Sequence, residues 1–416
     1  MAKTKLTIKG NKFYINGDLT YSEIENGNPE TRGLLMNARF IQGIFDDQAD
    51  PDRFNRFGRT FDPDKNTDDL ISALPEWYSY GLRAFTVGFQ GGGPCFTTSN
   101  QTIHNNPFGQ DGKSLDPAYA QRMKRLINAA DELGMVVIVS YFYGDQARRL
   151  KDGQAVVNAV KTASNFLRDN EFSNVIIEVA NEHNIGAFDK HPLIKTAEGM
   201  SLLIDIARKE SGGLPVGSSG GGGYVNEEVC RASDVILIHG NGQTRQQYYK
   251  MIQKAKEWCP QKPIVCNEDS QSIGQLAVAY QTRTSWGYYN NMTKQEPPAD
   301  WSITEGEDKF FALRMADGLG IKTADDIKEE DQYYLQGREP EMEYQGKRWL
   351  RLASLYPEKV DYVEFYKNDD LEYTSYDEPY TVNFKTTWAQ GPIEADTADQ
   401  WKAIVHLRTG ETKTIN

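Results

Sequence analysis

Two glutamates stand at the ends of short apolar runs, and their side chains could do acid–base and nucleophilic chemistry together. The first run covers residues 175–182 and ends at Glu182, and the second covers residues 263–268 and ends at Glu268. Short runs rich in Val and Ile are typical of strands that are buried on both faces. If one carboxyl group carries a proton while the other is ionised, the first can protonate a leaving oxygen while the second attacks carbon.

Both glutamates belong to an alternation of strand-like and helix-like segments that fills most of the chain. The clearest helix is expected from the N-cap Asp116 and Pro117 to Gly134, because apolar residues recur there at helical spacing. Eight such units predict an α/β fold, the (β/α)8 TIM barrel. The strands are expected at residues 34–45, 82–89, 135–143, 175–182, 214–219, 235–240, 263–268 and 285–290.

In such a barrel the reactive groups lie at the carboxyl ends of the strands. Glu182 would end the fourth strand and Glu268 the seventh, so the two carboxylates are expected to face each other across the barrel mouth. Cleavage of a glycosidic bond needs this arrangement, with one acid for the leaving oxygen and one carboxylate for the attack.

The Glu-x-x-Asn-Glu run that ends at Glu182 resembles the fourth-strand signature of the clan A glycoside hydrolases, the cellulase-like superfamily of retaining enzymes. The strand-end position of Glu268 and the opening Ile8-x-Gly-x-x-Phe13-x-x-Asn-Gly17 segment are also similar to that clan, over roughly residues 5–320. The resemblance implies that Glu182 is the general acid/base and Glu268 the nucleophile of a β-linked glycoside hydrolase. It also implies that the mechanism uses no metal and no organic cofactor.

The same resemblance implies a set of substrate contacts. Asn181 would bind the sugar 2-hydroxyl, His239 would contact the sugar or the nucleophile, and Trp286 would lie under the reacting sugar. Aromatic rings at strand ends can stack on sugar faces, and an arginine at the mouth could bind a uronate or sulfate. For each residue the alternative is an ordinary core, structural or surface role. The expected contacts are Asn181, His239, Trp286, Tyr288, Tyr141, Tyr143 and Arg148.

The chain also departs from the clan pattern. Asn241 stands where a tyrosine usually follows the sixth-strand histidine, which leaves open what orients the nucleophile. Thr86 occupies the place of an arginine late in the second strand, and Arg83 is out of register with it. Glu178 shares a strand face with Glu182 but lies four residues deeper, so it is expected to be a hydrogen-bonded core carboxylate.

Two β segments flank the barrel. An alternating segment at residues 6–17 predicts a β-hairpin that closes one barrel end. Residues 1–345 are expected to form the barrel with this hairpin, and residues 346–416 a small β-sandwich that resembles bacterial immunoglobulin-like modules. That module would either bind carbohydrate or brace the barrel.

Composition excludes several classes of function. The 416 residues carry 46 Lys and Arg against 59 Asp and Glu, a net charge of −13 that opposes binding to nucleic acid or an anionic membrane. No apolar run approaches the roughly 18 residues that span a bilayer. The amino terminus does not resemble a signal peptide, so the chain is expected to be cytoplasmic, or secreted or periplasmic after loss of an export signal.

Metal and disulfide chemistry are not expected. The four cysteines are scattered without a Cys-x-x-Cys pair, which favours free thiols, and the five histidines form no cluster in the sequence. This argues against a metal-dependent barrel lyase or aldolase. The main alternative to a hydrolase is a catalytically inactive barrel that binds carbohydrate, and the sequence leaves the sugar, the linkage and the oligomeric state open.

Overall fold

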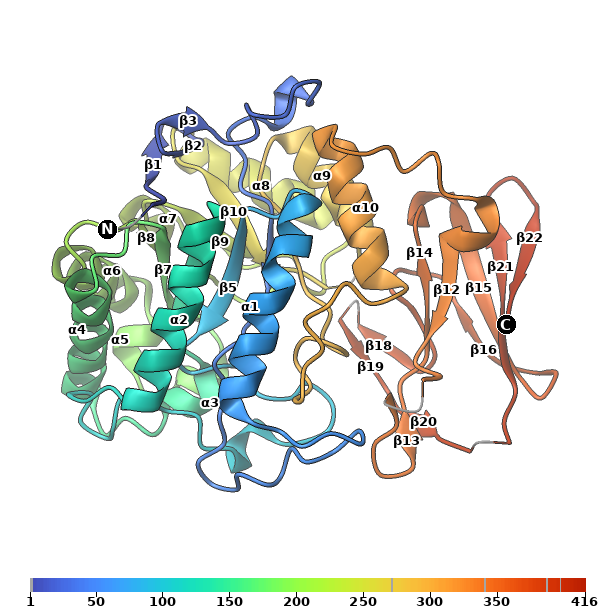
Figure 1. The fold of residues 1–416 in the computed structure, drawn as a ribbon, viewed down its shortest axis with the longest axis horizontal. Helices are drawn as coiled ribbons and strands as arrows, with labels where there is room; N and C mark the ends of the chain where they lie inside the picture. The colour runs from blue at the N-terminus through green and yellow to red at the C-terminus, as the bar shows by residue number, and fades with distance from the viewer. Residues whose placement is uncertain (1–2, 271, 340–341, 387, 397) are drawn as a thin grey trace.

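The computed structural model describes residues 3–270, 272–339, 342–386, 388–396 and 398–416 (Figure 1). Eight parallel strands, each followed by a helix, confirm the predicted α/β barrel. The strands are β4 (Asn37–Arg39), β5 (Ala84–Gly88), β6 (Val136–Phe142), β7 (Val175–Ala180), β8 (Val216–Gly217), β9 (Ile236–His239), β10 (Ile264–Glu268) and β11 (Gly287–Tyr288).

Parallel pairing closes the strands into a ring. One sheet runs in the order β11-β4-β5-β6-β7-β8, and β9 pairs with β10. A parallel bridge between Val265 and Ser285 joins β10 to the start of β11, and the backbone N–H of Asp234 donates to the carbonyl of Val216 between β8 and β9. The carboxyl ends of all eight strands therefore meet at one mouth.

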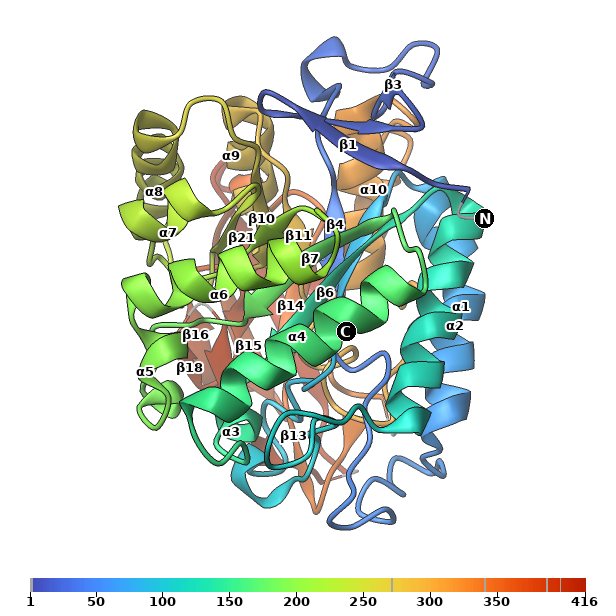
Figure 2. The ribbon, with the colours of Figure 1, turned by 90° about the vertical axis from the view of Figure 1, so that its left-hand side faces the viewer.

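Helices surround the strands, as Figures 1 and 2 show. In α2 the Asp116 side chain accepts hydrogen bonds from the first-turn backbone, Pro117 occupies the first turn and Gly134 ends the helix at a positive φ of 78°, as the sequence predicts. No helix among the described residues is long and apolar enough to cross a membrane. The covering helices are α1 (Pro63–Ser79), α2 (Pro117–Leu133), α4 (Gly153–Asp169), α6 (Ala197–Glu210), α7 (Glu227–Ala232), α8 (Arg245–Trp258), α9 (Gly274–Thr282) and α10 (Glu307–Leu319), and α3 (Gly144–Ala147) and α5 (Pro192–Lys195) are short.

The amino-terminal hairpin covers the end of the barrel opposite the mouth. β1 (Leu6–Lys9) pairs with β2 (Lys12–Ile15), and β3 (Asp18–Leu19) adds a third strand. Leu6 and Phe13 are buried in one cluster with Ala84, Val136 and Ile176 from the starts and middles of the barrel strands. Burial of these apolar side chains stabilises the closed end and leaves the other end for binding.

The carboxyl-terminal part is a β-sandwich, as expected. One antiparallel sheet has the order β12-β14-β17, and the other has the order β16-β15-β21-β22. Leu335, Leu352, Phe365 and Val405 from both sheets share one buried cluster. The strands are β12 (Tyr333–Gln336), β13 (Lys347–Arg348), β14 (Arg351–Ser354), β15 (Val360–Lys367), β16 (Asp370–Ser375), β17 (Tyr380–Thr381), β18 (Phe384–Thr386), β19 (Ala389–Gln390), β20 (Ile393–Glu394), β21 (Trp401–Leu407) and β22 (Thr412–Ile415).

The sandwich takes in residues on the barrel side of the expected boundary at 345/346. β12 pairs with β14 in the register Leu335 to Leu352, and its apolar side chains belong to the sandwich core. The acidic composition before residue 346 hides this strand, because only alternate residues of a half-buried strand need to be apolar. We propose that the boundary lies between α10 and β12.

Buried polar contacts hold the sandwich against the barrel. Arg351 on β14 forms an ion pair with Glu307 at the start of α10 and donates a hydrogen bond of 3.0 Å to Asn290 after β11. The Glu378 carboxylate accepts hydrogen bonds from the Gly274 N–H at the start of α9. Two loops that follow barrel strands are therefore in contact with the sandwich.

Candidate active site

A cleft of about 510 Å³ opens at the carboxyl ends of the barrel strands. Glu182 and Glu268 both line it, as the sequence predicts. Three glycines, Gly221, Gly222 and Gly242, form part of its wall. The other lining residues are Pro94, Cys95, Asn100, Tyr143, Ile185, Gly221, Gly222, Asn241, Gly242, Gln243, Asp269, Ser270, Tyr289, Asn291, Gln295 and Trp388.

Glu182 lies just beyond the end of β7 and is partly exposed. Its backbone has a φ of 55°, in the left-handed region that non-glycine residues seldom adopt. Its backbone N–H donates a hydrogen bond of 3.1 Å to Oγ of Ser219 in the segment after β8. Strain of this kind is typical of residues that the surrounding structure holds in place for a function.

Glu268 ends β10, and both of its carboxylate oxygens have partners. Nε of Arg39 lies 2.8 Å from Oε2, and Nδ2 of Asn241 donates a hydrogen bond of 2.6 Å to Oε1. Burial raises the pKa of Glu268, while the positive charge of Arg39 and the neighbouring His239 act to lower it. Arg39 and Asn241 therefore both favour the ionised form of this carboxyl group.

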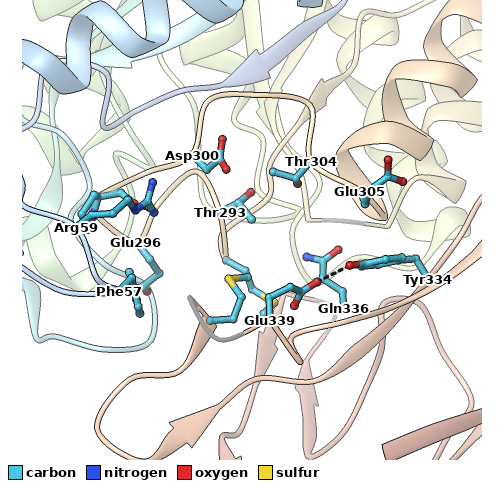
Figure 3. Close-up of a pocket in the computed structure, with 13 residues that line it drawn as sticks. Phe57, Arg59, Thr293, Glu296, Asp300, Thr304, Glu305, Tyr334, Gln336 and Glu339 are labelled. Atoms are coloured by element: carbon cyan, nitrogen blue, oxygen red, sulfur yellow. Dashed lines mark hydrogen bonds between the residues drawn. The ribbon is translucent and has the colours of Figure 1, made fainter. Parts of the chain in front are cut away.

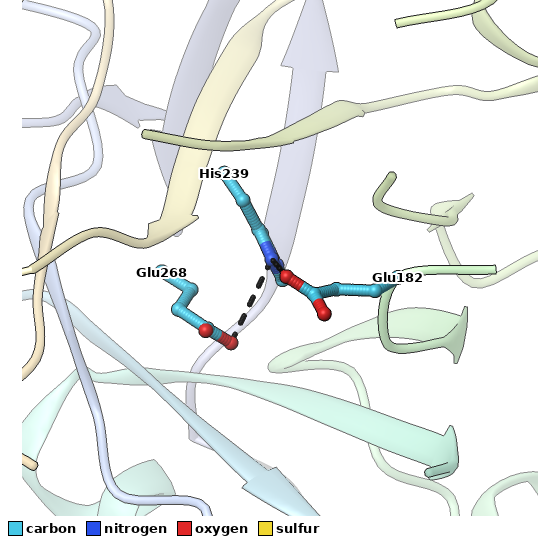
Figure 4. A group of neighbouring side chains, drawn as sticks. All are labelled: Glu182, His239 and Glu268. Atoms are coloured by element: carbon cyan, nitrogen blue, oxygen red, sulfur yellow. Dashed lines mark hydrogen bonds and ion pairs between the residues drawn. The ribbon is translucent and has the colours of Figure 1, made fainter. Parts of the chain in front are cut away.

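His239 ends β9 and lies between the two glutamates, fully buried (Figure 4). Its Nδ1 is 3.1 Å from Oε1 of Glu182 and 3.7 Å from Oε2 of Glu268, and its Nε2 is 3.9 Å from Oε1 of Glu178. Burial lowers the pKa of His239, but the negative charges of Glu268 and Glu182 outweigh burial and raise it. The histidine thus contacts both candidate catalytic groups, whereas its full burial leaves no surface for a sugar.

The two carboxylates approach each other closely. One oxygen of Glu182, one oxygen of Glu268 and one ring nitrogen of His239 all lie within 4.8 Å of one another. Figure 4 shows the three side chains converging from β9, from the end of β10 and from the segment after β7. A proton and a nucleophilic oxygen can therefore be delivered to a single bond in the cleft.

Arg39 is a site residue that the sequence analysis missed. It ends β4, is buried, and donates a hydrogen bond of 2.7 Å from Nη2 to Oδ1 of Asn181 in addition to its contact with Glu268. In the barrel register Arg39 stands opposite Thr86, the residue that replaces the expected second-strand arginine. A charged residue inside the largely apolar expected strand at residues 34–45 was the available signal. Arg83 lies elsewhere, paired with Glu23.

Asn181 and Glu178 are both buried on the mouth side of β7. Asn181 is buried and does not line the cleft; its Oδ1 accepts a hydrogen bond from Arg39, which in turn pairs with Glu268, and its expected contact with the sugar 2-hydroxyl stays a prediction. Oε1 of Glu178 accepts a hydrogen bond of 2.9 Å from Nδ2 of Asn267, which confirms Glu178 as a core carboxylate.

Only one of the four aromatic residues expected to contact sugar lines the cleft. Tyr143 does so, whereas Trp286, Tyr288 and Tyr141 are buried in the barrel core. Nε1 of Trp286 donates to Asp269, the Tyr288 hydroxyl donates to Asp308, and Tyr141 shares a hydrogen bond with Ser164. The expectation for these three rings is therefore corrected: they pack between strands and helices. Tyr289 and Trp388 line the cleft instead.

Arg148 does not reach the cleft. It ends the short helix α3, where its guanidinium donates hydrogen bonds to the side chain and the carbonyl oxygen of Asp145. Its guanidinium is part of a local, partly exposed ion pair and does not line the cleft. The expected uronate or sulfate contact is thus corrected for this residue.

A second pocket, of about 310 Å³, lies between barrel loops and the sandwich (Figure 3). Its carboxylates already have partners: Glu296 pairs with Arg56, and Glu339 accepts a hydrogen bond of 2.8 Å from the Tyr334 hydroxyl. Neither Glu182 nor Glu268 lines it. The cleft at the strand ends is therefore the candidate active site.

Glu182, His239 and Glu268 could also offer three ligand atoms to a divalent cation. Two observations oppose that use of the cluster. Arg39 already places a positive charge 2.8 Å from one oxygen of Glu268, and the Asn241 amide occupies the other. A cation here would be repelled by Arg39, so proton chemistry fits the cluster better.

Three of the four cysteines, Cys230, Cys259 and Cys266, are buried free thiols. Cys95 is also a free thiol but is partly exposed in the cleft wall. Burial raises the pKa of the Cys95 thiol well above its ordinary value. A thiol that stays protonated is a weak nucleophile, so the reactive oxygen of Glu268 is the better candidate.

No protein-family model and no curated protein matches the sequence. Solved structures share its fold. A glycoside hydrolase of family 5 from Bacteroides vulgatus has a TM-score of 0.52 and 12% identity, over 98% of this chain and 94% of that one. A protein named as a glycoside hydrolase has a TM-score of 0.50 and 10% identity, over 97% and 96% of the two chains.

The chain also matches part of a longer protein. It spans 58% of an FMN-binding beta-glucuronidase from Facaelibacterium prausnitzii, with 99% of this chain covered, a TM-score of 0.46 and 12% identity. At these identities the similarity is one of fold.

Proposed function

We propose that the chain is a retaining glycoside hydrolase that cleaves a β-linked oligo- or polysaccharide, with Glu268 as nucleophile and Glu182 as general acid/base. The observation that carries the proposal is that one carboxylate oxygen of Glu182 and one of Glu268 lie within 4.8 Å of each other. Retaining enzymes have carboxyl groups about 5–5.5 Å apart, whereas inverting enzymes leave about 6.5–9.5 Å for a water molecule. One oxygen of each carboxylate within 4.8 Å of the other is compatible with the shorter separation, and on this ground we propose direct attack by one carboxylate.

In the first step an oxygen of Glu268 forms a bond to the anomeric carbon while the glycosidic bond breaks. The contacts with Arg39 and Asn241 favour the ionised carboxylate and fix its orientation. Glu182 gives a proton to the leaving oxygen, so no free alkoxide forms. His239 lies 3.1 Å from Glu182 and can share that proton before the substrate arrives.

In the second step a water molecule breaks the glycosyl–Glu268 bond. Glu182 now lacks its proton and takes one from the water, which restores both carboxyl groups to their starting states. Because Glu268 is neutral while it carries the sugar, the negative charge that held a proton at the Glu182–His239 contact is absent. The same glutamate can therefore act first as acid and then as base.

An inactive carbohydrate-binding barrel is the alternative. Such a protein would need the cleft but not the groups that ionise and orient a nucleophile. The contacts of Glu268 with Arg39 and Asn241, together with the contact of Glu182 with His239, support a working catalyst.

The experiment is hydrolysis of a panel of aryl β-glycosides and β-linked oligosaccharides by wild type and by Glu268→Gln. We expect the variant to lose at least about 10³-fold in kcat, as the loss of a nucleophile does in other enzymes. NMR of the first product should show the β anomer. Glu132→Gln, which neutralises an exposed carboxylate paired with Lys3, is the matched control and should be fully active.

Equal rates for wild type and Glu268→Gln, or an initial α product, would contradict the assignment. Addition of EDTA separates the metal alternative, because proton chemistry needs no divalent cation. Activity that disappears with EDTA and returns with one divalent cation would show instead that Glu182, His239 and Glu268 bind a metal ion in a metal-dependent reaction.

A further inference from the structure

A tryptophan from the β-sandwich forms part of the wall of the candidate active site. Trp388 lines the same cleft as Glu182 and Glu268, although it lies more than 100 residues after both in the chain. Its side chain is 42% exposed, and it is one of few large apolar side chains exposed to this degree in the described structure. An exposed indole beside a polar cleft indicates a binding surface.

The barrel fixes the position of this residue. β18 and β19 pair as a small antiparallel hairpin, and Trp388 directly precedes β19. Nδ2 of Asn291, in the loop after β11, donates a hydrogen bond of 3.1 Å to the Trp388 carbonyl. Nε2 of Gln390 contacts Sδ of Met292 in the same loop at 3.3 Å. The tryptophan backbone is therefore attached to the barrel mouth before any ligand binds, which lowers the entropy cost of binding.

The rest of the cleft wall has a consistent chemistry. Amide and hydroxyl side chains line it, including Asn100, Gln243, Ser270 and Gln295. Among the described lining residues the ionisable groups other than Tyr and Cys are the acids Glu182, Glu268 and Asp269, with no Lys or Arg. Arg39 lies behind Glu268 and is already bound to it and to Asn181. Such a wall would repel an anionic sugar and can hydrogen-bond to the hydroxyls of a neutral one.

We propose that Trp388 is a stacking surface for a sugar ring of an uncharged glycan, so that the β-sandwich completes the substrate cleft of the barrel. The inference rests on the proposed function and names the class of its substrate. The C–H groups on one face of a pyranose pack against an indole ring, and the hydroxyls at its rim bind the amide groups nearby. The sandwich thus contributes to binding at the cleft itself.

The experiment measures binding separately from catalysis. The Glu268→Gln protein is titrated calorimetrically with the β-1,4-linked hexasaccharides of glucose, mannose and xylose, and with a hexagalacturonate as the anionic probe. We expect at least one neutral hexasaccharide to bind and the hexagalacturonate not to bind. Adding Trp388→Ala should weaken that binding about tenfold, whereas Trp388→Phe should keep most of it, because a ring remains.

Tyr376→Ala is the matched control. Tyr376 is another aromatic residue of the sandwich, 69% exposed, and it does not line the cleft. Its removal should leave the dissociation constant unchanged, and thermal melting of each variant shows that it is folded. Unchanged binding in Trp388→Ala, stronger binding of the hexagalacturonate, or no binding of any neutral hexasaccharide would overturn the inference.

Failure of the Trp388 inference can be distinguished from failure of the proposed hydrolase function. A neutral hexasaccharide that binds through Trp388 but is not hydrolysed by wild type would leave the stacking surface standing and remove the hydrolase assignment. If wild type hydrolyses the hexasaccharide and Trp388→Ala does not weaken its binding to the Glu268→Gln protein, the hydrolase assignment stands and the stacking surface is removed.

Discussion

Asn241 donates a hydrogen bond of 2.6 Å from its side-chain amide to Oε1 of Glu268, from the segment after β9 to the end of β10. The sequence resemblance expects a tyrosine at residue 241. In this chain Asn241 occupies that place, and its side-chain amide orients the Glu268 carboxylate. Gly222 allows this contact, because a Cβ at that position would lie 1.9 Å from the Asn241 carbonyl oxygen. The glycine-rich segment after β8 therefore positions the residue that positions Glu268.

Replacement of Asn241 by Ala should reduce kcat by about 10–100-fold. A hydrogen bond to a charged group is worth about 1.5–3 kcal/mol, and its loss frees the Glu268 carboxylate to rotate. Steady-state kinetics with the best substrate of the panel measure the effect. Asn241→Asp is the informative companion, since it keeps the size but places a like charge beside Glu268 and should lose more activity. Full activity in both variants would show that Arg39 alone orients the nucleophile.

Arg39 should set the acidic limb of the pH–rate profile. Burial raises the pKa of Glu268, and Arg39 is the first of the groups that oppose the rise. In Arg39→Met burial is less opposed, so the pKa of Glu268 rises further and the ionised nucleophile is lost at higher pH. The acidic limb of kcat/KM should therefore move upward, with proportionally more activity lost at pH 5 than at pH 8.

Arg39→Lys is the control for this change, because it retains the charge without the planar guanidinium. Its acidic limb should stay close to that of wild type even if its rate is lower. Circular dichroism and thermal melting establish that each variant is folded, since removal of one partner from a buried ion pair costs about 3–5 kcal/mol. An unmoved acidic limb in a folded Arg39→Met would contradict the assigned role.

The strand-end glutamates could be predicted because they follow two of the plainest apolar runs in the chain. Arg39 could not, because the expected first strand at residues 34–45 is longer than the observed β4 (Asn37–Arg39), which hides where the strand ends. The orientation of the Trp286 side chain could not be predicted from the sequence either. Strands of a parallel barrel are apolar on both faces, so their pattern does not tell which side chains face the mouth and which face the helices.

Trp388 was missed for a different reason. Its place in the cleft depends on a contact with Asn291, which lies 97 residues earlier in the sequence. Periodicity reports on neighbours within one element, and no local pattern encodes a contact between a barrel loop and a later sheet. Long-range contacts also brought β12 into the sandwich despite its acidic surroundings.

Trp286 should matter for stability and not for substrate affinity. Its ring packs against Phe311 on α10, and its indole N–H donates a hydrogen bond of 2.8 Å to buried Asp269. Trp286→Phe leaves Oδ2 of that carboxyl group without the indole donor, although the Ser270 N–H still donates to Oδ1, and this loss costs about 1–3 kcal/mol in addition to the lost packing. We expect a lower Tm by calorimetry with little change in KM. Trp388→Phe should show an unchanged Tm, and a rise in KM for Trp286→Phe alone would restore it as a sugar contact.

The attachment of the sandwich to the barrel should weaken as pH rises. Burial raises the pKa of Glu378 from 4.5 to about 8, although the Gly274 N–H at the start of α9 and the charge of Arg245 act in the opposite direction. A carboxyl group with a raised pKa binds more proton in the folded than in the unfolded protein between these two values. Its contribution to stability is therefore present below about pH 4.5 and is lost as pH rises toward 8.

Glu378→Gln removes this titration while retaining an oxygen that can accept from Gly274. The Tm of the variant relative to wild type should therefore increase steadily from pH 5 to pH 8.5, as calorimetry at several pH values can measure. Glu394→Gln, at an exposed carboxylate of the same sandwich, should follow wild type throughout. Parallel Tm profiles for wild type and Glu378→Gln would mean that the Glu378 carboxylate is already ionised at pH 5 and that its contact with α9 does not depend on a proton.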